Sequence, residues 1–122
     1  MFDEDLVKDI LTDTLNASKK VKSRCNKFNS ADDFLEDEES QIVLDSICMQ
    51  LIAIGEAIKK IDYITNKELF KKYKDIDWSK VAGIRDVLSH HYFDLNAETI
   101  YSVCQYHIDK LIITLEKILK EL

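Results

Sequence analysis

The chain contains no proline and only two glycines, Gly55 and Gly83, among its 122 residues. β-Hairpins and tight turns depend on these two residue types, because proline presets the turn geometry and glycine supplies left-handed backbone. Their scarcity excludes a fold of many short strands joined by turns. The sequence therefore predicts an all-α protein.

Cysteine is also scarce, with Cys25, Cys48 and Cys104 odd in number and widely spaced. A chain of this length buries enough surface to form a core without covalent crosslinks, so we predict no disulfide framework. No arginine-rich or apolar leader precedes Phe2. Together these features lead us to expect a cytoplasmic protein with a single domain over residues 1–122.

Long uncharged apolar runs are missing as well, since Lys, Asp or Glu interrupts them every few residues, and we expect no membrane-spanning helix. The net charge of −6 argues against indiscriminate nucleic-acid binding, which requires many Lys and Arg side chains. The charge is uneven, however. Residues 19–24 and the segment from Lys67 to Arg85 are basic, and residues 36–39 are acidic. These runs indicate either solvated surfaces or a basic path to Arg85 beside an acidic, partner-binding face.

Apolar residues recur at roughly helical spacing along most of the chain. We predict helices over residues 3–27 and 38–61, a short acidic turn capped by Ser30, a short helix through Tyr73, a helix from Trp78, and a final helix. The predicted helix-starting groups are a capping box of Thr65 with Glu68, and the N-caps Asp77 and Asn96. Short connections make neighbouring helices antiparallel, so the expected architecture is an up-and-down bundle of four to five helices. The apolar residues expected in its core are Leu6, Ile10, Ala17, Val21, Ile42, Ile47, Leu51, Ile54, Ile58, Ile61, Val81, Ile84, Val87, Leu88, Ile100, Val103, Ile108, Leu111, Leu115, Ile118 and Leu122.

One short stretch concentrates the chemistry: Arg85, His90, His91 and Tyr92 lie within eight residues. A guanidinium is a permanent, fork-shaped anion binder, and an imidazole takes and gives protons near neutral pH. This combination suits a phosphodiester.

The stretch from Gly83 to Phe93, with its Arg-x4-His-x-Tyr pattern, resembles the signature of the HepT toxins. These are small all-helical proteins of the HEPN superfamily from bacterial and archaeal toxin–antitoxin pairs. Two further stretches, Ile52–Ala57 and Tyr73–Trp78, are also similar and occur in the same order. The resemblance covers the last two thirds of the chain, and the first forty residues match only in helical character.

The resemblance implies a homodimer whose paired motifs meet in a cleft, and cleavage of RNA without metal or cofactor. A ribose 2′-hydroxyl would attack the adjacent phosphate, with His90 as general acid and base and Arg85 as the phosphate stabiliser. It also implies a partner, an MntA-type nucleotidyltransferase antitoxin, which adenylylates the tyrosine that corresponds to Tyr92.

Helix geometry constrains how the motif residues meet. Residues seven apart differ by only about 20° around a helix, so Arg85 and Tyr92 share a face, whereas residues five apart diverge by about 140°. His90 joins them only if the helix loosens or if a second subunit completes the site. Gly83 and Ser89 are small enough for such close helix packing. His91 is the weakest candidate, because it points about 100° away from His90.

Several alternatives stay open. Glu56 either orients Arg85 or is an ordinary helical glutamate. Cys104 and His107 have the spacing of half a metal site, but core packing is the simpler explanation. Asp75, Asp77 and Asp86 offer carboxylates for a divalent ion, although a helix cap accounts for two of them, and we predict no metal. The alternative function is a non-catalytic HEPN-like module that binds a nucleotide or a nucleotidyltransferase, with Arg85 as a phosphate clamp.

Overall fold

The structure, a computed structural model, describes residues 2–90 and 97–122, and of Ser89 and His90 it describes the backbone alone. The described residues contain helices and no strands, which confirms the predicted all-α class. The helices are α1 (Glu4–Cys25), α2 (Glu38–Ile64), α3 (Trp78–His90), α4 (Ala97–Ser102) and α5 (Ile108–Glu121), with 3-10 turns at Asp32–Leu35 and Phe70–Lys72 and a π-helical segment at Val103–His107.

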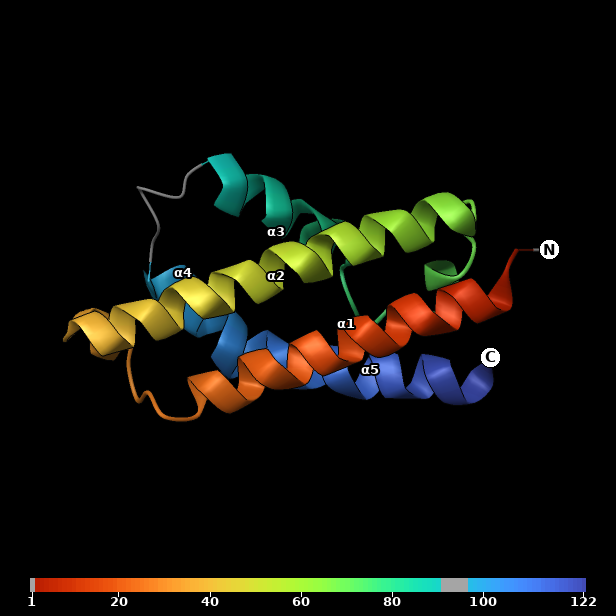
Figure 1. Ribbon diagram of the computed structural model, residues 1–122. Helices are drawn as coiled ribbons and strands as arrows, with labels where there is room; N and C mark the ends of the chain where they lie inside the picture. Colours follow the sequence, from red (N-terminus) through yellow and green to blue (C-terminus); the bar gives the residue numbers. More distant parts are fainter. Residues whose placement is uncertain (1, 91–96) are drawn as a thin grey trace.

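The long helices run up and down, as the short connections predicted (Figure 1). α2 packs between α1 and α3, and α5 packs along the other side of α1. α3 is therefore the outermost helix on its side of the bundle, held mainly by α2. This position places the Arg85 region at the surface.

α2 is the core helix, as expected from its apolar periodicity. Ile47, Leu51, Ile54 and Ile58 are all buried, whereas Ile42 is 58% exposed. On α1 Val21 is buried as predicted, but at the start of the helix Leu6 is 40% exposed and its neighbour Val7 is fully buried instead. Val87 on α3 is also exposed, contrary to the predicted core.

By length and composition α2 is apolar enough to cross a membrane, so our expectation that every apolar run is too short for this is wrong. Eight of its residues are buried, and it packs against both α1 and α3. The central helix of a bundle has to be apolar on more than one side for this reason.

Three carboxylates begin the long helices. The side chains of Asp3, Asp37 and Asp77 accept hydrogen bonds from the backbone amides of Leu6, Ser40 and Lys80 at 3.1, 2.8 and 3.2 Å. Each satisfies an amide that the first helical turn leaves without a partner, and Asp77 does so as predicted.

The predicted capping box is wrong. The Thr65 hydroxyl donates back to the Ile61 carbonyl at 2.8 Å and ends α2 rather than beginning a new helix. Left-handed backbone at Asn66 and Lys67 then reverses the chain, and only the 3-10 turn Phe70–Lys72 follows. Ser30 likewise does not cap the acidic turn with its side chain. Asn96 lies outside the described residues.

The final helix is interrupted by the π-helical segment Val103–His107. Its apolar positions Ile100, Val103 and Ile108 include one step of five residues, which an α-helix would rotate out of register. A π-turn holds an additional residue and returns Ile108 to the core, where it is 2% exposed.

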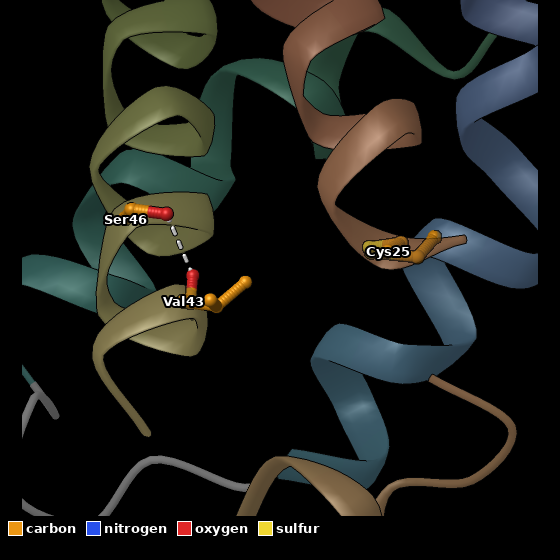
Figure 2. The surroundings of a disulfide bond; sticks show 4 residues. Cys25, Val43 and Ser46 are labelled. Atoms are coloured by element: carbon orange, nitrogen blue, oxygen red, sulfur yellow. Dashed lines mark hydrogen bonds between the residues drawn. A yellow bond between two sulfur atoms is a disulfide. The ribbon is translucent and has the colours of Figure 1, made fainter. Parts of the chain in front are cut away.

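A disulfide joins Cys25, the last residue of α1, to Cys104 in the π-helical segment, so the prediction of no disulfide is wrong (Figure 2). The two residues are 79 positions apart in sequence and their Cα atoms lie 6.1 Å apart. On α2 nearby, the Ser46 hydroxyl donates to the Val43 carbonyl at 2.7 Å. Cys48 is free and buried, and burial raises the pKa of its thiol to about 11.

Candidate active site

Close packing of α3 on α2 positions Arg85. A Cβ atom at Gly55 would lie 3.0 Å from the Cβ of Arg85 and 3.1 Å from the backbone oxygen of Val81. These contacts are tighter than nine in ten real Cβ contacts, so any residue other than glycine would require α3 to shift by a few tenths of an ångström. Gly55 therefore brings the Arg85 backbone directly onto α2, beside the next residue of that helix, Glu56.

Arg85 is held by two carboxylates. Its Nε lies 2.6 Å from Oε1 of Glu56, and one terminal nitrogen donates to Oδ1 of Asp86 at 2.9 Å. The other Asp86 oxygen accepts from Nζ of Lys59 at 3.2 Å. We call these four residues the Arg85 cluster: Glu56, Lys59, Arg85 and Asp86.

The cluster alternates in charge, which stabilises each ionised group. The hydrogen bond that Arg85 donates to Asp86 and the charge of Glu56 raise the pKa of Arg85. The hydrogen bonds from Arg85 and Lys59 lower the pKa of Asp86. The Arg85 side chain is still 39% exposed. It is thus fixed in orientation and remains open to a ligand from solvent.

Glu56 contacts Arg85 in the way the sequence suggested. Sequence reasoning did not identify Lys59, although it lies three residues after Glu56 and so shares its helix face. It assigned Asp86 to a different, metal-binding alternative. The structure instead joins Asp86 to two cations.

The other motif residues are only partly described. His90 is the last residue of α3, and its side chain lies outside the described part, as do His91 and Tyr92 altogether. Gly83 has open space where a Cβ atom would be. Within one chain the close helix approach is at Gly55, whereas the close packing predicted at Gly83 involves a second subunit.

Two of the candidate metal ligands already have other roles. Cys104 is bonded to Cys25, and Asp77 caps α3, so neither is a free ligand. Over residues 2–90 and 97–122, no three His, Cys, Asp or Glu side chains gather as a metal site would require.

A cavity lies between α3 and α5. This cavity of about 400 Å³ has an apolar floor that includes Leu51, Ile84 and Leu111, and its lining also includes Lys80 and Lys110. The basic segment predicted before Arg85 thus meets a lysine of α5 that is distant in sequence.

The profile of the HepT-like ribonuclease family matches residues 5–118. The chain belongs to this family. It is 30% identical over 116 residues to a Methanocaldococcus jannaschii protein whose name describes it as a proposed RNase, covering 95% of this chain and 89% of that one. A similarly named protein of Caldanaerobacter subterraneus is 34% identical over 93 residues, covering 76% of this chain and 73% of its own length. No solved structure matches the chain significantly.

Membership of this family makes the protein a ribonuclease, with RNA as its substrate class. The family match spans nearly the whole helical bundle, including the first forty residues that sequence patterns alone related to it only by their helical character.

Proposed function

We propose that this HepT-like ribonuclease is the toxin of a toxin–antitoxin pair and cleaves RNA without metal. The single observation that carries the proposal is the geometry of Arg85, whose Nε is fixed by Glu56 while 39% of the side chain stays exposed. A pre-oriented guanidinium stabilises developing phosphate charge without reorganising during the reaction.

The Arg85 cluster also explains how the cation is released to substrate. An RNA phosphate competes with Asp86 for the terminal nitrogen of Arg85, because both are anionic acceptors. Asp86 keeps its second partner, Lys59, after the exchange. The Asp86 carboxylate therefore keeps a cation beside it throughout.

In the proposed reaction the 2′-hydroxyl oxygen bonds to phosphorus and the bond from phosphorus to the 5′-oxygen breaks. His90 accepts the hydroxyl proton, and an imidazole delivers a proton to the leaving oxygen. The products are a 2′,3′-cyclic phosphate and a 5′-hydroxyl. Proton transfer of this kind contributes typically about 10²- to 10⁴-fold to the rate.

We propose that the second imidazole comes from a second copy of the chain, in a two-fold dimer built on α3. Val87 is 54% exposed and Gly83 is open, so α3 presents a small-residue and apolar surface outward. A stable dimer should bury at least roughly 1,000 Å² in total. A monomer by light scattering at micromolar concentration would refute this arrangement.

Activity is tested with Arg85→Ala and His90→Ala, and with Arg24→Ala, which changes the other arginine of the chain, as a control on α1. We expect both motif variants to lose cleavage while retaining helicity, and the control to remain active. Cleavage should persist in EDTA and leave 2′,3′-cyclic phosphate ends. Inhibition by EDTA that added metal reverses would contradict the mechanism.

Regulation by an MntA-type nucleotidyltransferase in the cytoplasm completes the proposal, with Tyr92 as the adenylylation site. Incubation with the transferase and ATP should add AMP masses to the wild type, and Tyr92→Phe should prevent this while staying at least partly active. If the wild type never cuts RNA yet binds the transferase tightly, the non-catalytic interaction module is the correct function instead.

A further inference from the structure

The acidic residues of α5 are all engaged. Asp109 pairs with Lys22 at 2.7 Å and Glu116 with Lys19 at 4.0 Å, both on α1. Glu121 accepts a hydrogen bond from the Tyr73 hydroxyl at 2.6 Å. Each carboxylate of this helix therefore has a partner on another element, although Glu116 and Glu121 still line one surface hollow with Lys117 and Lys120.

The lysines of the same helix are not neutralised. Lys110, Lys117 and Lys120 are exposed, and none has a carboxylate within 4.0 Å among the described residues. Lys117 lies 6.0 Å above the ring of Tyr73. The acidic residues of α5 pair with groups on other elements. The three lysines therefore form a strip of unpaired positive charge, although the charges of the helix itself sum to zero.

Two exposed non-polar groups lie along this strip. The Tyr106 side chain is 73% exposed and Ile113, seven residues later, is 66% exposed. Ile113 and Lys120 are seven residues apart on α5 and so share a face, and Tyr106 lies in the π-helical segment that leads into this helix. An exposed aromatic ring followed by unpaired lysines is a combination with which proteins bind single-stranded nucleic acid, by stacking on bases and neutralising phosphates.

The strip is continuous with the helix that carries Arg85. Lys110 and Lys80 line the same cavity between α5 and α3, together with His107. The next residues of that lining, Val81 and Ile84, lead along α3 to Arg85.

We propose that Tyr106, Lys110, Lys117 and Lys120 form an RNA-binding track that holds single-stranded substrate outside the cleavage site. The proposal rests on the ribonuclease function and adds to it the surface that receives the substrate. A local track reconciles RNA binding with the net charge of −6, because only the strip meets phosphates.

Binding is measured by fluorescence anisotropy of a labelled single-stranded RNA of about 12 nucleotides, within the site sizes typical of such surfaces. All variants are made in the full chain with Arg85→Ala, so that the probe stays intact. The test variant is Lys110→Gln with Lys117→Gln and Lys120→Gln. Its control, with the same change of charge, is Lys8→Gln with Lys20→Gln and Lys27→Gln.

We expect the test variant to lower the slope of log affinity against log salt by about 2, since each phosphate contact on a single strand contributes about 0.7. The control should leave the slope unchanged. Tyr106→Ala should weaken binding at least about fivefold with no change in that slope, because stacking releases no counterions. Circular dichroism should show unchanged helicity for all of these variants.

Equal binding by the test and control variants overturns the track. If the test variant instead loses affinity only for vesicles of anionic phospholipid, the strip is a membrane surface and the proposal fails. The two proposals can fail separately. If the protein with Arg85 intact never cuts RNA but its RNA binding depends on the three lysines, the cleavage function is refuted and the track is supported.

Discussion

Gly55 and Arg85 lie in direct contact, close enough that a Cβ on Gly55 would sit 3.0 Å from the Cβ of Arg85. The glycine of one helix thereby determines where the candidate catalytic cation of another is held. Glu56 follows Gly55 and binds Arg85, so one pair of neighbouring residues sets both the position and the orientation of the guanidinium.

Gly55→Ala should therefore reduce RNA cleavage at least about tenfold and also destabilise the fold. The added methyl meets the backbone oxygens of Val81 and Ala82 at 3.1 and 3.2 Å, and backbone cannot move aside cheaply. Overpacking of this kind costs about 1 to 3 kcal/mol, which exceeds the gain of about 1 kcal/mol in helix propensity. Urea unfolding and initial cleavage rates measure the two effects.

Gly83→Ala is the matched control, because its added methyl meets nothing within 4 Å in the same chain. In the monomer it should be neutral or stabilising by up to about 1 kcal/mol. A Gly55→Ala protein as active and stable as wild type would show that α3 does not need this close approach.

Glu56→Gln should lower kcat more than it raises KM, because the carboxylate orients Arg85 and does not itself bind RNA. Because both side chains of this pair are partly exposed and screened by solvent, we expect a fall in kcat of several-fold rather than a complete loss of activity. Glu116→Gln on α5 is the control, as its partner Lys19 is distant at 4.0 Å and both side chains are about half exposed. An unchanged kcat in Glu56→Gln would show that packing alone positions Arg85.

Reduction of Cys25–Cys104 should lower the free energy of unfolding by about 4.5 kcal/mol, the chain-entropy value for a crosslink between residues 79 apart. Urea unfolding with and without dithiothreitol measures the difference. The double variant Cys25→Ser with Cys104→Ser should unfold alike in both conditions. Dithiothreitol sensitivity in that variant would assign the effect to something other than this bond.

Tyr73 should make stability depend on pH at the alkaline end. Burial, followed by its hydrogen bond to Glu121, raises the pKa of Tyr73 from 10.0 to about 12. The folded state therefore favours the protonated phenol, and this contribution is complete below pH 10 and lost as the pH rises toward 12. The difference in unfolding free energy between wild type and Tyr73→Phe should be constant up to pH 10 and then shrink. A difference that grows above pH 10 would contradict the assignment.

Much of the fold follows from the sequence alone. The scarcity of glycine and proline determined the all-α class, and the apolar spacing located α2 and its buried face, because the burial of a helical stripe depends on local periodicity. The Arg-x4-His-x-Tyr pattern indicated the family that the profile match shows.

Long-range contacts decided the rest. Gly55 was read only as part of a motif, and nothing in the sequence showed that Arg85 would lie against it or that Asp86 would be shared with Lys59. Cys25 and Cys104, 79 residues apart, meet only because α1 packs along the final helical region. Local patterns fix which residues face inward within one helix, whereas the pairing of side chains on different helices depends on how those helices pack, and that is a property of the whole bundle.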